Sequence, residues 1–537
     1  MIARKSLLVV IAQFFTRSLG WIGLVVLAKL WGGFAPEALG VIGFAMAFIG
    51  LFNVIGDLGF GQAHVKRISE GKDLGSCIGT FVAIKIMLTS AMVAAVVIGI
   101  FIWRNLLHGS FVDATTESVV LVFLVYFIFS NMQNISTATF NGRQEIAKLQ
   151  ITTMFENIVK VPLTIVVVVA GVSIAMLGPR VNWPEILNPL QQYIAKHAVG
   201  SLAMTYVFGI ITSCIVGFLF LRKYPFKKPS MELGKSYLVF ALPVLAISII
   251  VTISTNIDKI MIGFYWTATE VGYYFSVQQI LQIILIVSQA MITVLFPAFS
   301  KFHSMRDFRK LNETTLLAER YISLVMIPVI VVIILFAKPI ISIMLNSSFY
   351  PAVPVLIVLA VYALIISFMA PFTSLIAGMN RPGAAAKNVL MICIINIPLN
   401  FLFIPQRGLL TPFGINGPTG AAVATATSAF VGLIGLKVVT KKLTGIKLLQ
   451  NHTLLHIVAG AVMAGFLYVI SLIILIDRWF SVLVFAGVGI LVYLGVLYIL
   501  KEFRGQDFRF FLNILHPKKM MSYIKTELDE EKQNIEK

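Results

Sequence analysis

The run ISLVMIPVIVVIILFA, residues 322–337, contains no charged side chain, and VPLTIVVVVA, residues 161–170, has the same character. A helix needs about 20 mostly apolar residues to cross the hydrocarbon core of a bilayer, which is about 30 Å thick. These runs are continuous, whereas the strands of a transmembrane barrel alternate between polar and apolar residues. The two stretches therefore predict membrane-spanning helices.

Similar stretches recur along the whole chain. Hydrophobic residues make up 58% of the sequence, charged residues make up 12%, and the mean hydropathy is +0.93. A soluble core cannot absorb that much apolar surface. We expect an all-α polytopic membrane protein with about 14 transmembrane helices. The expected spans are 7–31, 39–61, 75–103, 118–141, 151–177, 198–221, 236–264, 272–299, 318–344, 352–379, 385–405, 419–440, 453–476 and 480–500.

The distribution of Lys and Arg predicts the orientation of these spans. Of the 42 basic residues, 31 fall on one side when the two termini are included, six fall on the other side, and five lie inside spans. Cytoplasmic loops carry the excess of positive charge in membrane proteins. We therefore predict a multi-pass protein of the cytoplasmic membrane with both termini in the cytoplasm.

Several function classes are disfavoured by the sequence. The formal net charge of +19 follows from the same asymmetry, so nucleic acid is not expected as a partner. The three cysteines lie in different spans without ligand spacing, so neither a disulfide nor a metal site is expected. No GxxxxGK[ST] loop is present, and the acidic residues of the outer loops form no pair at metal-ligand spacing. We expect no cofactor and no enzymatic activity.

Ionisable residues inside spans are the strongest functional signal, because each costs about 2.5–3.5 kcal/mol at a helix centre on insertion scales. Five are basic and three are acidic, namely Arg17, Lys29, Lys85, Lys160, Lys259, Asp57, Glu156 and Asp258. If they share one cavity, its charge is positive and it favours an anionic passenger.

Some of these residues also have a structural explanation. Lys29 and Asp57 lie near span ends, where a side chain can reach the interface. Glu156 and Lys160 are four residues apart on one helical face and could neutralise each other. Asn256 belongs to a polar stripe on the seventh span that indicates either a hydrated passage or interhelical hydrogen bonds.

Two pairs of segments indicate an internal repeat. PEALGVIGF, residues 36–44, is similar to ATEVGYYFS, residues 268–276, and residues 142–163 are similar to residues 380–399. Transporters are often built from duplicated halves. The predicted organisation is an N-terminal lobe at 1–221, a C-terminal lobe at 222–440, two additional spans at 441–502 and a cytoplasmic tail at 503–537.

Four stretches together resemble one known family. They are IGDLGFGQAHVKRISE at 55–70, NIDKIMIGFYWTATEVGYYFSVQQI at 256–280, SSFYPAVPVLIVLA at 347–360, and INIPLNFLFIP followed by GINGPTGAAVATATS within 395–428. In this order they resemble the multidrug/oligosaccharidyl-lipid/polysaccharide exporters, and within them the flippases of polysaccharide and glycan precursors. The resemblance covers nearly the whole chain.

The resemblance implies two pseudo-symmetric six-helix lobes around a central cavity that opens alternately to each side. The implied substrate is a glycan linked to a polyprenyl phosphate or pyrophosphate, with membrane lipids and other glycan assembly proteins as partners. Basic side chains facing the cavity would hold the phosphate. We assign substrate binding to Arg17, Lys85, Lys160, Lys259 and Asn256, and charge tuning or ion coupling to Asp57, Glu156 and Asp258.

Two alternative functions stay open. One is a cation-coupled drug or metabolite antiporter of the same superfamily, for which an acidic cavity is expected. The other is a scaffold of a polysaccharide-synthesis complex that does not transport. We also expect the outer loop 178–197 to cover the bundle or touch a partner, and the tail residues 503–515 to form an interfacial helix.

Overall fold

The computed structural model describes residues 2–106, 108, 111, 113–175, 188–447, 450–473 and 478–503. These residues form helices and connections, and no strand occurs among them. The helices are α1 (Ile2–Trp31), η1 (Gly32–Phe34), α2 (Ala35–Asp57), α3 (Phe60–Ser69), α4 (Leu74–Asn105), α5 (Ala114–Gly142), α6 (Ile146–Ala175), α7 (Asn188–Lys196), α8 (Ala198–Leu221), α9 (Met231–Tyr265), α10 (Ala268–Ile284), α11 (Ile286–Ser304), α12 (Phe308–Leu335), α13 (Ala337–Met344), η3 (Ser347–Ala352), α14 (Val353–Gly378), α15 (Pro382–Phe403), η4 (Thr411–Phe413), α16 (Gly417–Thr444), α17 (Asn451–Ile473) and α18 (Trp479–Ile499).

The predicted all-helical membrane fold is confirmed. Within the described residues, 11 stretches are long and apolar enough to cross a membrane, and the first of them, Ala12–Asp57, runs from within α1 to the end of α2. Many large apolar side chains on these helices are exposed, for example Met87 and Val97 on α4. An apolar surface of this kind suits a hydrocarbon solvent. The number of 14 crossings stays a prediction.

Three expected spans are interrupted, and the one expected at 318–344 is divided at Phe336 into α12 and α13. The span expected at 39–61 ends as a helix at Asp57, because Leu58 and Gly59 adopt left-handed backbone conformations with φ of 46° and 83°. The span expected at 272–299 is divided at Leu285 into α10 and α11. Left-handed residues end a helix without a change in hydropathy, so the apolar pattern did not reveal the first break.

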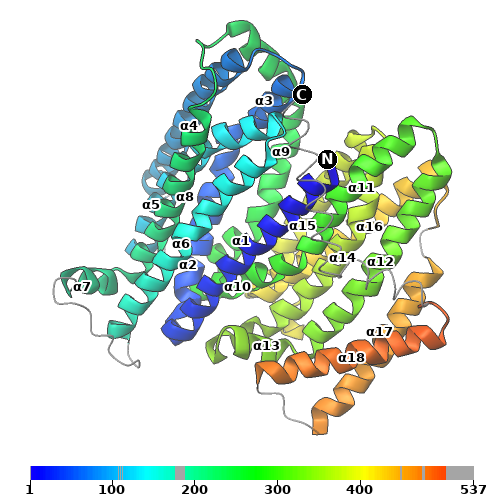
Figure 1. Ribbon diagram of the computed structural model, residues 1–537. Coiled ribbons are helices and arrows are strands. Elements are labelled where there is room, and N and C mark those ends of the chain that lie inside the picture. The colour runs from blue at the N-terminus through cyan, green and yellow to red at the C-terminus, as the bar shows by residue number, and fades with distance from the viewer. Residues whose placement is uncertain are drawn as a thin grey trace.

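The helices gather into two groups. In the first half, α1, α5, α6 and α8 pack on one another, and in the second half α11, α14, α15 and α16 do the same. Figure 1 shows the first group on one side and the second on the other, with α17 and α18 at the outer edge of the second. The main direct contact between the halves joins α2 and α10.

The α2–α10 contact depends on two glycines. A Cβ atom added at Gly40 would lie 1.6 Å from the carbonyl oxygen of Ala268, and one added at Gly272 would lie 1.8 Å from the carbonyl oxygen of Pro36. Only glycine permits backbones to approach this closely. The two segments that the sequence predicts as repeats therefore pack directly against each other.

The helix α9 contacts both halves. Near its start, Arg67 on α3 donates to the carbonyl oxygen of Ser236 at 3.1 Å, and His64 on α3 is hydrogen-bonded to the Tyr237 hydroxyl at 2.9 Å. Along its length α9 also packs on α2 and α15. One continuous helix, α9, therefore contacts helices of both groups. The lobe boundary expected at residue 222 stays a prediction.

The last two helices pack against α12 as a hairpin. Gly460 lets α17 approach Ile327 on α12, and Gly489 lets α18 approach Met463 and Leu467 on α17. The predicted tail helix, apart from Phe503, and residues 178–187 of the predicted outer loop lie outside the described residues. Cys77, Cys214 and Cys393 are buried and free.

Candidate functional site

A cavity of about 300 Å³ lies between the two halves. Its walls come from α1, α2, α5, α6 and α8 of the first half and from α10 of the second half. The lining residues that carry charge or hydrogen-bonding groups are Thr16, Arg17, Trp21, Tyr126, Glu156, Asn157, Lys160, Thr164, Tyr206, Gln279 and Gln282. Three of the predicted site residues, Arg17, Glu156 and Lys160, are thus brought together.

Arg17 connects the two halves across this cavity. Its guanidinium donates a hydrogen bond to the backbone carbonyl oxygen of Gln282 on α10. An arginine carries five N–H donors, so this bond leaves most of them available to other acceptors. Arg17 is partly buried, which suits a charge that faces a polar space inside a membrane protein.

Glu156 and Lys160 point to different partners on the cavity wall. The Tyr126 hydroxyl donates to Glu156 at 3.0 Å, and the Lys160 ammonium lies 4.7 Å from the centre of the Tyr206 ring. No Lys160–Glu156 ion pair occurs in the described structure. The predicted alternative, in which the two charges neutralise each other, therefore does not take the form of a direct ion pair and otherwise stays a prediction.

The lining has a positive bias. Arg17 and Lys160 carry two positive charges, and Glu156 carries one negative charge. The indole nitrogen of Trp21, which also lines the cavity, is buried and has no hydrogen-bond acceptor among the described residues. Buried donors are almost always satisfied, so this N–H is suited to donate to a bound oxygen.

Lys85 lies elsewhere, in a pair with another predicted residue. Its ammonium is 2.6 Å from Asp57, 3.0 Å from the carbonyl oxygen of Gly56 and 3.2 Å from the Asn131 side-chain oxygen. Lys85 is 1% exposed, whereas the Asp57 side chain is 39% exposed. Neither residue lines the cavity, and the substrate-binding role of Lys85 stays a prediction.

Asp258 forms a separate buried cluster in the second half. Its carboxylate accepts hydrogen bonds from Tyr274 at 2.6 Å, from Asn400 at 2.7 Å and from Thr425 at 2.7 Å. Asn396 joins the cluster through Asn400 and Thr425. The side-chain oxygen of Asn400 is buried and has no hydrogen-bond partner in the part of the chain that the structure describes. Four helices therefore converge on one carboxylate.

Lys259 and Asn256 lie on α9 next to this cluster and do not line the cavity. Lys259 donates to the carbonyl oxygen of Thr255 at 3.2 Å, and the Asn256 amide donates to that of Thr252 at 2.9 Å. A Cβ atom at Gly50 on α2 would lie 3.3 Å from the Asn256 oxygen, so Asn256 packs at the contact between the halves.

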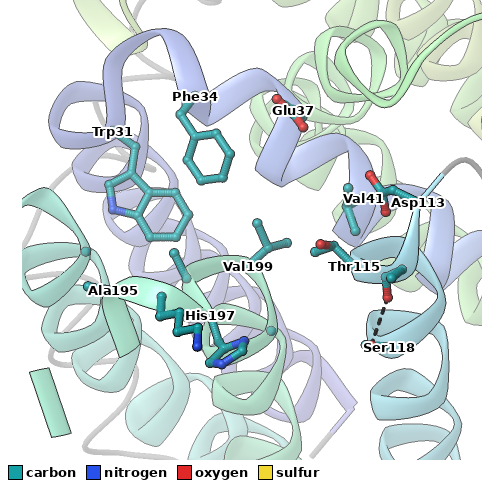
Figure 2. A pocket seen from close by; sticks show the side chains of 15 residues that line it. Trp31, Phe34, Glu37, Val41, Asp113, Thr115, Ser118, Ala195, His197 and Val199 are labelled. Carbon is teal, nitrogen blue, oxygen red and sulfur yellow. Dashed lines mark hydrogen bonds between the residues drawn. The ribbon is translucent and has the colours of Figure 1, made fainter. Parts of the chain in front are cut away.

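A second cavity of about 580 Å³ lies at the other end of α1 (Figure 2). Figure 2 shows Trp31 and Phe34 on one side and Glu37 and Asp113 on the other. Its charged lining is mixed, with two carboxylates and Lys196, and it contains none of the predicted site residues. The positively biased cavity around Arg17 is therefore the better candidate for an anionic ligand.

Sequence reasoning missed the aromatic members of the cavity. Trp21, Tyr126 and Tyr206 lie within apolar spans. An aromatic residue in a span gives no sign of whether it faces lipid or a polar space. No group of three or more His, Cys, Asp or Glu residues suited to a metal occurs in the part of the chain that the structure describes.

Comparisons with known proteins agree with this architecture. A probable low-salt glycan biosynthesis flippase, Agl15 of Haloferax volcanii, is 22% identical over 510 residues, which is 95% of this chain and 98% of that protein. Among solved structures, the lipid II flippase MurJ in an inward closed conformation matches with a TM-score of 0.68 and 19% identity, over 91% of this chain and 98% of that one.

An inward-facing multidrug resistance MATE transporter of the MOP superfamily matches with a TM-score of 0.60 and 14% identity, over 81% of this chain and 98% of that one. The two structural matches confirm the predicted MATE-like fold. The family model described as "Polysaccharide biosynthesis protein" matches residues 2–303, more than half of the chain. The chain is therefore a member of this polysaccharide biosynthesis family.

Proposed function

We propose that this protein is a flippase that moves lipid-linked oligosaccharide or polysaccharide precursors across the cytoplasmic membrane by alternating access. The substrate is a glycan carried on a polyprenyl phosphate or pyrophosphate. The observation that carries the proposal is the positively biased cavity, in which Arg17 and Lys160 lie between the two halves. The likeness to a protein named as a glycan biosynthesis flippase over nearly the whole chain supports it.

The cavity chemistry suits a phosphorylated sugar. Arg17 and Lys160 supply charge-assisted hydrogen bonds to phosphate oxygens, and the Trp21 N–H supplies one more donor. Glu156 and the amides of Gln279 and Gln282 can bind sugar hydroxyl groups. The lipid tail stays in the bilayer while the head group occupies the polar space.

The construction of the cavity supports alternating access. Five of its walls belong to the first half and one, α10, belongs to the second half. Rocking one half against the other changes the distance between α10 and Arg17, and so opens or closes the cavity. With both termini in the cytoplasm, the Gly40–Gly272 contact lies toward the outer surface and closes that side.

We assign ion coupling to the Asp258 cluster. A buried carboxylate on α9 among amide and hydroxyl groups from three other helices is suited to take up a proton or an alkali-metal cation. Tyr274 on α10 belongs to this cluster, and α10 also forms a wall of the cavity. A proton or cation bound at the Asp258 cluster is therefore able to affect the substrate cavity through α10. We assign to Glu156 the tuning of the charge of this cavity. The protein itself is a transporter and not an enzyme.

The test is transport by purified protein in vesicles. A fluorescent polyprenyl pyrophosphate-linked oligosaccharide is scored by its protection from a membrane-impermeant quencher. Arg17→Ala is expected to slow flipping by about tenfold or more, the effect of losing about 1.4 kcal/mol of interaction with the phosphate. Lys72→Ala, which removes an exposed loop charge, is the matched control and should leave the rate unchanged.

Each alternative predicts a different outcome of the same assay. An antiporter, which the MATE-like fold also fits, would export organic cations and leave the lipid-linked glycan in place. A scaffold would move neither compound. Flipping at the wild-type rate by the Arg17→Ala variant would refute the assignment of the site.

A further inference from the structure

A groove of about 740 Å³ that the proposed function does not use lies on the outside of the first half. Its walls come from α4, α5 and α8, and its rim is the connection between α8 and α9. Figure 1 shows these three helices on the side of the first group that faces away from the second group. The walls carry large apolar side chains, namely Ile78, Val82, Phe129, Ile211, Ile215 and Phe218. The groove is therefore suited to a hydrocarbon chain.

The groove opens toward the membrane. Ile215 and Leu219 on α8 are 54% and 59% exposed, whereas Ile78 and Leu221, which also line the groove, are buried. An apolar surface that is exposed within a transmembrane span meets the chains of the surrounding lipids. A lipid chain is therefore the molecule that can enter the groove from the outside.

The rim of the groove carries positive charge. Arg222 and Tyr224 line the groove, and Lys223 lies between them in the sequence. Arg222, Lys223 and the nearby Lys228 are exposed, and none of the three forms an ion pair in the part of the chain that the structure describes. Tyrosine is enriched where membrane and water meet. The rim thus combines an interfacial aromatic ring with basic side chains that are available to an anion.

The rim is fixed in place against α4. The backbone amide of Lys227 donates to the carbonyl oxygen of Gly75 at 3.2 Å, and its ammonium lies 2.8 Å from the Asp73 carboxylate. A Cβ atom added at Gly79 would lie 1.9 Å from the carbonyl oxygen of Lys227, so the connection packs directly on the helix. A site that is formed before its ligand arrives loses little conformational entropy on binding.

We infer that this groove binds an anionic phospholipid of the surrounding bilayer. A hydrocarbon chain lies between α4, α5 and α8, and the phosphate lies beside Arg222 and Lys223, which supply charge-assisted hydrogen bonds. On the orientation predicted from the basic residues, the rim lies at the cytoplasmic surface, where anionic lipids attract basic segments next to the membrane.

The polyprenyl carrier of the proposed substrate is a less suitable occupant. Its head group must reach the cavity between the two halves, whereas the groove belongs to the first half and the α8–α9 connection. No described residue lines both the groove and the cavity around Arg17. The inference therefore goes beyond the proposed flippase activity and requires no lipid-linked glycan.

The test is lipid binding by delipidated protein in a non-ionic detergent, with the first bound lipid measured by native mass spectrometry. Anionic phosphatidylglycerol is compared with zwitterionic phosphatidylcholine that carries the same acyl chains. We expect the wild type to bind phosphatidylglycerol about tenfold more tightly or better, and the double variant Arg222→Gln with Lys223→Gln to bind both lipids about equally.

The matched control for the rim is Arg309→Gln with Lys310→Gln. It removes two adjacent, exposed basic charges at the start of α12, in the second half. This control should keep the wild-type preference for phosphatidylglycerol, because the removed charges do not belong to the rim.

A further variant tests the groove itself. Ile215→Trp places a larger side chain in the groove and leaves the basic rim intact, and its exposed position spares the packed interior. We expect it to weaken the binding of phosphatidylglycerol about tenfold, because the displaced chain buries less apolar area. Ile434→Trp, at an exposed residue of α16, is the matched control and should bind as the wild type does.

Three results would overturn the inference. They are equal affinity of the wild type for the two lipids, a preference for phosphatidylglycerol that the rim variant retains, and displacement of phosphatidylglycerol by a polyprenyl phosphate at lower concentration. The last result would make the groove part of the substrate path. Because binding is measured without transport, each result is independent of whether the protein flips a lipid-linked glycan.

Discussion

Gly40 on α2 and Gly272 on α10 occupy reciprocal positions in the contact between the two halves. Gly40 faces the backbone at Ala268 and Gly272, and Gly272 faces the backbone at Pro36 and Gly40. Each glycine belongs to one of the two repeated segments. A pseudo-two-fold axis that relates the two segments would pass between these equivalent glycines, as expected for a transporter built from duplicated halves.

This contact yields the first prediction. Gly40→Ala places a methyl group 1.6 Å from a carbonyl oxygen, so α2 and α10 must separate. Overpacking of this kind costs about 1–3 kcal/mol. We expect the variant to fold, to show a longer α2–α10 distance between spin labels, and to flip substrate about tenfold more slowly.

The matched control is Gly465→Ala on α17, where an added Cβ atom meets nothing within 4 Å. This variant should retain the wild-type distance between the spin labels on α2 and α10 and the wild-type rate of flipping. If Gly40→Ala showed the same distance distribution as the wild type, the contact would not be the closed end of the transport cycle.

The second prediction concerns the sign of charge in the cavity. Glu156→Gln removes the only negative charge among the described residues that line the cavity, and it keeps the side-chain shape. Binding of a polyprenyl pyrophosphate, measured at low salt, should become about two- to tenfold tighter, and the gain should shrink as salt screens the charges. Tyr126→Phe, which removes only the hydrogen bond to Glu156, should change the affinity much less. Weaker binding by Glu156→Gln would mean that the carboxylate contacts the ligand.

The sequence predicted the fold and part of the site for identifiable reasons. Long apolar runs determine helices and their approximate ends, and the cost of burying charge singled out Arg17, Glu156 and Lys160. Asn256, noted in a polar stripe, lies on the same helix as Asp258, whose carboxylate accepts a hydrogen bond from Asn400. These are properties of single helices, which a sequence displays directly.

Relationships between helices could not be predicted in the same way. Asp57 and Lys85 were expected to act separately, but α2 and α4 are neighbours and the two side chains pair. The role of Tyr126 depends on which face of α5 meets α6. Likewise, the repeat indicated two related halves without indicating that Gly40 and Gly272 touch. Neighbouring helices and their rotations are set by packing across the whole bundle.

The third prediction tests ion coupling at Asp258. Asp258→Asn keeps the size of the side chain and removes its charge, so a proton or cation is no longer bound there. We expect flipping without an ion gradient to continue, while the stimulation by a proton or sodium gradient disappears. Rates are compared in vesicles with and without each gradient. Stimulation equal to that of the wild type would place the coupling site elsewhere.

The fourth prediction concerns the loop between α5 and α6. Partial burial by itself would raise the pKa of Glu145, but hydrogen bonds from Lys148, Tyr224 and Arg143 outweigh it and lower the pKa from 4.5 to about 2. A carboxylate with a lowered pKa in the folded state stabilises the protein above the unfolded value and loses that effect as the pH falls toward 2.

Glu145→Gln should therefore lower the free energy of unfolding by about 1 kcal/mol at pH 7, a modest value because the carboxylate is partly exposed and its ion pairs are screened by solvent. The difference from the wild type should shrink between pH 4.5 and 2. Denaturant unfolding in detergent across this range measures it. A difference that stays constant with pH would show that the charge of Glu145 is not responsible.

The last prediction separates two roles of Lys85. Lys85→Ala leaves Asp57 and the Asn131 oxygen without their shared donor, and breaking a buried pair costs about 3–5 kcal/mol. Because Asp57 is partly exposed, we expect the lower end of this range.

The loss of flipping in this single variant would by itself fit either substrate binding or a structural role. The double variant Lys85→Met with Asp57→Asn removes both charges and keeps the volume, so it should recover thermal stability. If the pair is structural, the double variant also recovers flipping; if Lys85 holds the phosphate, it is stable and still slow.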